Sequence, residues 1–171
     1  MRHVSRSDDR DPIAEAHRQW AAHGWAAAAD GMALVTSVVR VQQLLMERID
    51  PVLKQHGLTF ARYEILRLLA FSQAGRMPMM RLGSLLQVHP ASVTSAVDRL
   101  QAQGYVDRER RTDDRRVVLA SLTDVGRAVV ERATLDLNEV FSTPGIGPDD
   151  VRDLTDLLTR LRGAAGDTVQ R

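Results

Sequence analysis

The sequence predicts a mainly α-helical protein that carries one small β-hairpin. Leu, Val and Ala recur at helical spacing through most of the 171 residues, and aromatic residues make up only 4%. The helical period is interrupted once, after Gly104, where YVDRER alternates, RRTDD is typical of a turn and RRVVLASL is rich in β-branched residues. The core is therefore expected to consist of aliphatic side chains on helices, with the hairpin as the exception.

Two helices are expected in the N-terminal part. Residues 1–10 are polar and charged and are predicted to be disordered. Asp11 then suits an N-cap and Pro12 the first position of a helix, with a break expected near Asp30 and Gly31. The next helix is long, ends at Gly57 and has an apolar side formed by Leu34, Val38, Val41, Leu45, Ile49 and Leu53.

The middle of the chain has the spacing of a helix-turn-helix. Thr59 is expected to cap the helix FARYEILRLLAFSQ, which Gly75 and Pro78 end. The short helix MMRLGSLLQ follows, and only Val88, His89 and Pro90 separate it from ASVTSAVDRLQAQ. Two short helices with so short a connection are typical of a helix-turn-helix.

Two helices are expected after the hairpin. Thr123 suits the N-cap of DVGRAVVERATLDLNEVF, and the loop STPGIGP contains several helix breakers. Asp149 and Asp150 suit the first turn of a last helix, where the positive end of the helix dipole favours acids. Val151, Leu154, Leu158 and Leu161 give this helix one apolar side.

The second helix of the helix-turn-helix has an outer face of small polar side chains. Val93, Val97 and Leu100 recur at core spacing. The opposite face shows Ala91, Ser92, Ser95 and Arg99, with Thr94 to one side. Small hydroxyl and methyl groups let a helix approach base edges in a DNA major groove. An ordinary amphipathic helix at a solvated surface is the alternative.

The hairpin concentrates positive charge at its tip. Its arginines are Arg108, Arg110, Arg111, Arg115 and Arg116. A guanidinium can enter a DNA minor groove when another group holds its side chain in place, and Asp114 has the spacing to hold Arg116. A solvated, self-neutralising hairpin is the alternative for an isolated ribbon. Directly after a helix-turn-helix, the arginine-tipped ribbon indicates the wing of a winged helix.

These segments together resemble a known family. LQVHPASVTSAVDRLQAQGYVDR followed by DRRVVLASLTDVG is similar to the winged-helix core of the MarR family of bacterial transcription regulators, over roughly residues 32–162. The resemblance implies a homodimer on pseudo-palindromic double-stranded DNA, with recognition helices in successive major grooves. Asp114 and Arg116 match the family's Asp-x-Arg, which implies that Arg116 reaches the minor groove. Arg111 and Thr112 stand where many relatives have Asp-Pro, so this wing tip is more basic.

The interpretation assigns a role to each candidate residue. Ser92, Thr94, Ser95 and Arg99 are expected to meet the major groove and nearby phosphates. Arg115 and Arg116 are expected to serve the wing, with Asp114 positioning Arg116. Arg108, Arg110 and Arg111 are expected to add phosphate contacts.

The expected organisation places the DNA-binding domain between two sets of dimerisation helices. Packing within one subunit is the alternative for the apolar stripes of those helices. The expected segments are a tail (1–10), N-terminal helices with a ligand cleft (11–57), the winged helix-turn-helix (58–122), C-terminal dimerisation helices (123–163) and a second tail (164–171).

A small-molecule effector is expected near the N-terminal helices. Trp20, Trp25, Arg62 and Tyr63 offer rings and a cation, which suit an aromatic carboxylate or phenol. The alternative for Trp20 and Trp25 is that they anchor the terminal helix against the core.

The sequence contains no motif that is typical of an enzyme or of a metal site. The chain has no cysteine, its five histidines lack metal-ligand spacing, and it has neither a glycine-rich phosphate loop nor a G-x-S-x-G elbow. We therefore expect no enzyme activity, metal or cofactor. Without a signal peptide or an apolar span, a cytoplasmic location is expected. The predicted function is a transcription regulator, a repressor relieved by a small aromatic or anionic ligand. The alternative is a winged-helix protein–protein interaction module without sequence-specific DNA binding.

Overall fold

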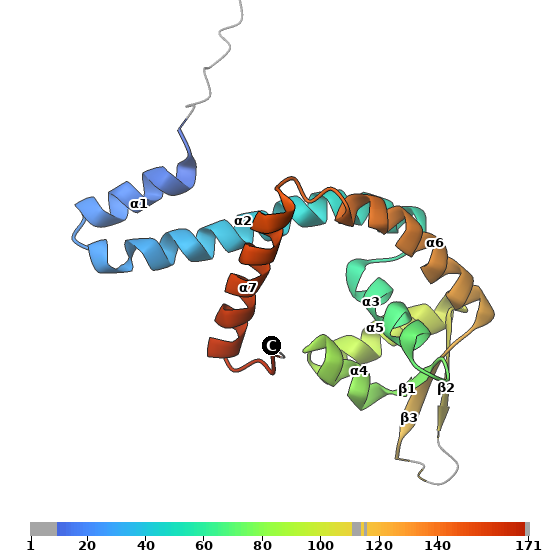
Figure 1. Ribbon diagram of the computed structural model, residues 1–171. Helices are drawn as coiled ribbons and strands as arrows, with labels where there is room; N and C mark the ends of the chain where they lie inside the picture. The colour runs from blue at the N-terminus through green and yellow to red at the C-terminus, as the bar shows by residue number, and fades with distance from the viewer. Residues whose placement is uncertain (1–9, 111–113, 115, 170–171) are drawn as a thin grey trace, which may run out of the picture. The chain divides into compact units, whose positions relative to one another are not determined.

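The computed structural model describes residues 10–110, 114 and 116–169. In chain order its elements are α1 (Pro12–Ala22), α2 (Ala26–Gln55), α3 (Phe60–Phe71), β1 (Arg76–Pro78), α4 (Met79–Leu86), α5 (Pro90–Ala102), β2 (Val106–Arg110), β3 (Val118–Leu122), α6 (Asp124–Phe141) and α7 (Pro148–Ala164) (Figure 1). The predicted mainly α fold with a helix-turn-helix and a β-hairpin is confirmed. The chain forms two compact units, one ending at Arg48 and the other beginning at Ile49.

The first unit holds α1 and most of α2. The break expected near Asp30 and Gly31 is wrong, because the chain turns at Gly24, whose φ is +87°, and Gly31 lies inside α2. Only glycine adopts this left-handed φ at little cost, whereas one glycine within a long helix costs only about 1 kcal/mol. The ring nitrogen Nε2 of His17 lies 2.8 Å from Oδ1 of Asp30 and links the two helices.

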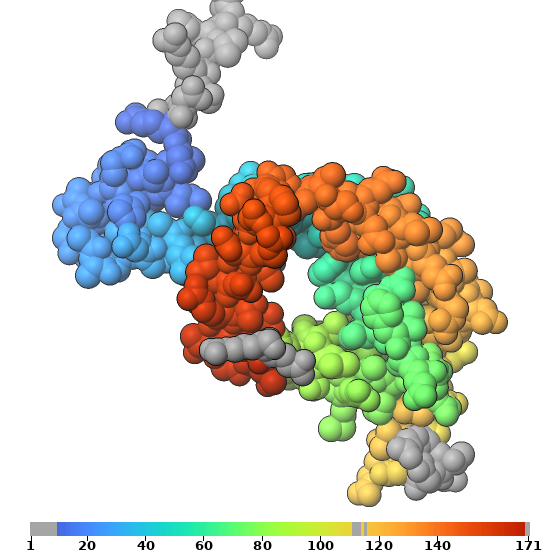
Figure 2. All heavy atoms as spheres, in the orientation of Figure 1, coloured from blue at the N-terminus to red at the C-terminus, as the bar shows by residue number. Residues whose placement is uncertain are grey.

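The second unit is built around aliphatic side chains that α3, α4, α5 and α6 bury together with the sheet. Leu66, Leu82, Val97, Leu100 and Val106 are fully buried. Helices α3, α4 and α5 are grouped next to the sheet, and the hairpin of β2 and β3 extends beyond them (Figures 1 and 2). The hairpin is thus held at its base by the same core that positions α5.

The sheet has three antiparallel strands in the order β1-β3-β2. Arg76 of β1 pairs with Ser121, and Arg110 of β2 pairs with Val118. The two-stranded wing is as predicted, but the sequence did not predict β1. A strand of three residues that ends in proline has no alternating pattern, and only its pairing with β3 defines it.

The two threonines expected as helix caps behave differently. Thr123 Oγ1 accepts from the backbone N–H of Gly126 at 3.0 Å and donates to the Gly104 carbonyl at 2.7 Å, so its predicted cap is confirmed. Thr59 lies at the N-cap position of α3 without a side-chain bond to the helix backbone. Its hydroxyl instead accepts from Nε of Arg62 at 3.3 Å.

Apolar faces of two helices remain exposed in the protomer. No residue of α7 is buried. The exposed aliphatic side chains are Leu34, Val35, Val38, Val39, Val41, Leu44 and Leu45 of α2, and Leu154, Leu157, Leu158 and Leu161 of α7. Contiguous apolar surface of this kind indicates an interface that another molecule covers. Within the part of the chain that the structure describes, no helix combines the length and apolarity needed to cross a membrane.

Glu64 on α3 gives a pH-dependent prediction. Burial raises the pKa of this carboxyl above its ordinary value of 4.5. The folded state therefore holds the proton more tightly than the unfolded state, and stability is lost as the pH rises through the folded pKa. We expect Glu64→Gln to raise Tm at pH 7, with the gain fading as the pH falls through the raised folded-state pKa toward 4.5. Thermal unfolding at pH 7 and pH 4, beside Glu131→Gln on the exposed side of α6, checks this. An equal gain at both pH values would contradict it.

Candidate nucleic-acid interface

Helix α5 buries one face and exposes the other. Val93 and Val97 are 2% and 0% exposed, whereas Ser92, Ser95 and Arg99 are exposed. Pro90 lies in the first turn, where a missing N–H costs nothing, and the predicted position of this proline is confirmed. The core contacts therefore fix which side chains of α5 face outward.

The outer face of α5 borders a depression of about 560 Å³. Its lining combines hydroxyl groups, methyl groups and two guanidinium groups, and contains no acid: Thr59, Arg62, Ala91, Ser92, Ser95, Ala96 and Arg99. One arginine comes from α3 and the other from α5. The surface is therefore positive, rich in hydrogen-bond donors and free of bulky side chains.

Arg62 lies at this surface, although the sequence suggested a ligand role for it. Its Nη1 donates to Oε1 of Gln103 at 2.9 Å, and Gln103 Nε2 donates to the Gly57 carbonyl at 3.1 Å. Both of its side-chain partners, Thr59 and Gln103, are neutral, so the positive charge of Arg62 is not compensated by them. The sequence did not reveal this position because Arg62 and Arg99 lie on different helices.

Thr94 is exposed on the side of α5, and its hydroxyl is already engaged. Thr94 Oγ1 donates to the Pro90 carbonyl one turn earlier at 3.1 Å. The methyl group and the remaining lone pairs are what this side chain can offer to DNA. Ser92 and Ser95 lie in the depression itself.

The wing presents Arg116 to solvent. This side chain is 94% exposed, and both its backbone N–H and its Nε donate to Oδ1 of Asp114, at 3.0 and 3.3 Å. Asp114 therefore restrains Arg116 at its backbone and at the Nε of its guanidinium group, while the side chain remains exposed. Arg110 is exposed at the end of β2, and Arg111 and Arg115 lie outside the described residues.

Arg108 faces α5 instead of the outer surface. Its side chain is only 23% exposed, and its Nη2 lies 2.6 Å from Oδ1 of Asp98. Residues two apart on a strand point to the same side, so Arg108 shares the inward face of β2 with the buried Val106. The phosphate contact expected for Arg108 does not fit this geometry.

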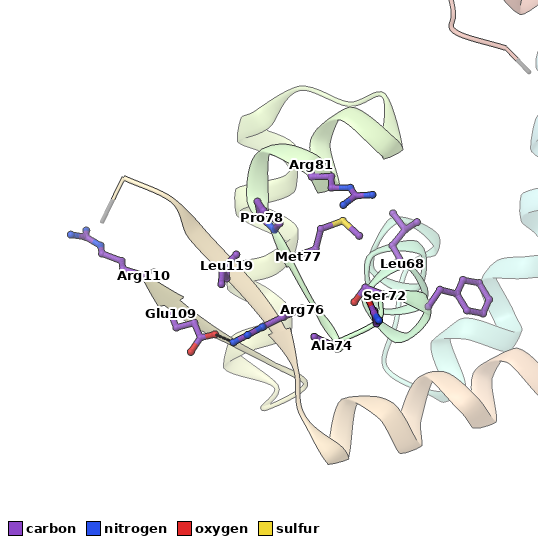
Figure 3. A pocket seen from close by; sticks show the side chains of 12 residues that line it. Leu68, Ser72, Ala74, Arg76, Met77, Pro78, Arg81, Glu109, Arg110 and Leu119 are labelled. Carbon is purple, nitrogen blue, oxygen red and sulfur yellow. Dashed lines mark hydrogen bonds and ion pairs between the residues drawn. The ribbon is translucent and has the colours of Figure 1, made fainter. Parts of the chain in front are cut away.

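The outer face of the sheet carries its own polar contact. Arg76 of β1 pairs with Glu109 of β2 at 3.3 Å, across the intervening β3 (Figure 3). This pair lies in a depression of about 1030 Å³ at the edge of the sheet. Arg81 and Met77 lie on one side of this depression, and Arg110 lines it at the end of β2 (Figure 3). The pair joins the two outer strands and braces the base of the wing.

The four residues expected to bind an effector divide between the two units. Trp20 and Trp25 of the first unit form an edge-on pair with ring centroids 5.3 Å apart, and both are exposed. His23 stacks on Trp25 at 6.0 Å. In the second unit Tyr63 is 7% exposed, and its hydroxyl lies 3.1 Å from Oγ1 of Thr134. Tyr63 thus contributes to the core that joins α3 to α6.

Among residues 10–110, 114 and 116–169, no three histidine or acidic side chains are close enough together to hold a metal ion.

Comparison with known proteins identifies the family. The model of the MarR family matches residues 58–118. YhbI of Bacillus subtilis, an uncharacterised HTH-type transcriptional regulator, is 31% identical over 118 residues, which are 69% of this chain and 72% of that protein. The chain belongs to the MarR family. Sco5413, a MarR family transcriptional regulator from Streptomyces coelicolor, is 44% identical, with a TM-score of 0.74 over 82% of this chain and 99% of its own. The homoprotocatechuate degradative operon repressor of Escherichia coli is 28% identical over 63% of this chain and 72% of that protein.

Membership in the MarR family confirms the resemblance inferred from the motifs and makes this chain a transcriptional regulator. The matched residues 58–118 run from the start of α3 into β3. They include the depression beside α5 and the described wing arginines. The winged-helix architecture is shared with Sco5413.

Proposed function

We propose that this MarR-family protein is a homodimeric repressor that binds pseudo-palindromic DNA operators and is released by a small aromatic or anionic ligand. The observation that carries the proposal is the positive depression beside α5, whose lining contains two arginines and no acid. A helix fits the width of a DNA major groove, and the small side chains of Ser92 and Ser95 allow its close approach to base edges. Arg62 and Arg99 then lie on either side of the depression, where they neutralise phosphates.

The wing supplies the second point of contact. Arg116 is exposed, and Asp114 accepts a hydrogen bond from the Nε of its guanidinium group. A guanidinium presented in this way suits the strongly negative potential of a narrow minor groove. Arg110, Arg111 and Arg115 add positive charge that attracts the neighbouring DNA phosphates.

Dimerisation is proposed from the exposed apolar faces of α2 and α7. A second copy of the chain is the commonest partner for such a surface, because a two-fold axis lets the same face serve both subunits. Two copies of α5 then address two half-sites of one operator. Repression agrees with the printed name of the Escherichia coli relative.

Relief by a ligand is proposed from the aromatic cluster of the first unit. Trp20, Trp25 and His23 present exposed ring faces that suit a flat aromatic molecule. Binding there would change the spacing of the recognition helices, with a coupling free energy of about 1–3 kcal/mol between ligand and DNA.

Titration of DNA binding against salt tests the proposal. The protein should bind a fragment from upstream of its own gene, or a selected genomic fragment, as a dimer. If six to ten phosphates are neutralised, affinity should fall by roughly 10³ to 10⁵ between about 50 and 200 mM salt. Absence of binding to any genomic fragment would overturn the proposal and favour the protein–protein interaction module.

Arg62→Ala and Arg99→Ala test the two sides of the depression. Because each variant removes a phosphate contact, each should weaken binding by a similar factor for all DNA sequences. Each should also make the plot of log K against log salt less steep, by about 1 per subunit. Arg132→Ala on the exposed side of α6 is the control for loss of one positive charge. An unchanged slope for Arg62→Ala would return Arg62 to the ligand role that the sequence suggested.

A further inference from the structure

A half-buried arginine joins the wing to the middle of the recognition helix. Nη2 of Arg108, on β2, donates to the Thr94 carbonyl at 3.0 Å and contacts Oδ1 of Asp98 at 2.6 Å. Thr94 and Asp98 are one helical turn apart on α5, so one guanidinium nitrogen reaches both. The Nε of Arg108 is buried and has no hydrogen-bond partner among the described residues. The guanidinium is thus turned toward α5.

We infer that Arg108 and Asp98 form a clamp that fixes the recognition helix relative to the wing, and that Arg108 is a positioning residue instead of a phosphate contact. The inference rests on the proposed DNA-binding function. The Thr94 carbonyl already accepts from the helix backbone, so its second lone pair takes the arginine and leaves α5 intact. The Arg108 side chain is only 23% exposed, whereas the Asp98 side chain is 57% exposed. The pair is shielded at its arginine end, so solvent and salt weaken it less than a fully exposed pair.

The position of Asp98 makes the clamp testable. Asp98 immediately precedes Arg99 on the helix that faces DNA, and a carboxylate there repels phosphates. Electrostatics alone predicts that neutralising Asp98 strengthens DNA binding. The clamp predicts the opposite, because α5 and Arg116 must reach the major and minor grooves of one duplex at the same time.

The experiment compares Asp98→Asn with Asp107→Asn in the full-length protein. Asp107 is exposed on the outer face of β2, next to Arg108 in sequence, and is the matched control. We expect Asp98→Asn to weaken binding roughly tenfold, the loss of about one arginine contact, and Asp107→Asn to leave it unchanged or slightly tighter. Equal or tighter binding by Asp98→Asn would overturn the clamp while leaving the proposed function standing.

A second measurement needs no DNA. Hydrogen exchange of the β2 amides should be faster in Asp98→Asn and in Arg108→Gln than in the native protein, and the double variant should exchange no faster than either single variant. Additive acceleration would show that the two side chains act separately and would overturn the clamp. If the native protein bound no DNA, the proposed function would fail and hydrogen exchange would still decide whether the clamp exists.

Discussion

Arg116→Ala is expected to reduce operator affinity by roughly 30-fold or more. The side chain is 94% exposed, so its removal leaves the fold intact, and the cost falls on DNA binding alone. A specific arginine contact to DNA contributes about 1–3 kcal/mol, and a dimer would lose two of them. Fluorescence anisotropy with a labelled operator fragment at fixed salt measures the loss.

Three companion variants separate the causes of that loss. Arg116→Lys keeps the charge without the planar fork, and we expect it to recover only part of the affinity. Asp114→Asn removes a negative charge near DNA but weakens the hold on Arg116 at its Nε, and we expect weaker binding in spite of the favourable charge change. Arg132→Ala controls for a one-charge loss outside the interface. If Arg116→Ala matched Arg132→Ala, the wing would contribute only its general charge.

The sequence predicted the fold well where the signals were local. Helical spacing, Pro90 at a first turn and Thr123 at a cap involve residues within one turn of each other, and each prediction is confirmed. It failed where tertiary pairing decides. The strand β1 exists because residues 76–78 pair with β3. The break expected near Gly31 was a local error, because the chain turns at Gly24 and Gly31 lies inside α2.

The candidate site shows the same division. The helical spacing of the apolar residues of α5 predicted that Ser92 and Ser95 face outward, and the structure shows both exposed. From composition alone, every arginine of the hairpin was expected to contact DNA. The alternation of side chains along β2 instead directs Arg108 toward α5. Arg108 lies two residues after the buried Val106, so both side chains point to the same side of β2. The alternating pattern of the sequence already contained this information. Arg62 was different: its place beside Arg99 depends on how α3 packs against α5, which no local pattern encodes.

Gly126→Ala is expected to destabilise the protein by about 3 kcal/mol, a fall in Tm of roughly 6–12 °C for a chain of this size. Gly126 is buried in the first turn of α6, where a Cβ would overlap the Tyr105 carbonyl oxygen and lie 2.9 Å from the carbonyl carbon. That carbonyl accepts from the Thr123 N–H at 3.1 Å, so the obstruction is backbone and cannot rotate away. The start of β2 would have to separate from the start of α6, and the Thr123 bonds to Gly104 and Gly126 would be strained together.

Gly31→Ala makes the same chemical change where nothing obstructs it. Gly31 lies within α2, and no atom would come within 4 Å of its new Cβ in the protomer. Alanine there should stabilise the helix by up to about 1 kcal/mol, since it restricts the unfolded chain and favours helical backbone. The two variants should therefore shift the urea midpoint in opposite directions. If Gly126→Ala shifted it upward as well, the contact between the first turn of α6 and the Tyr105 carbonyl would be loose. The wing would then be joined to α6 less rigidly than the Thr123 bonds indicate.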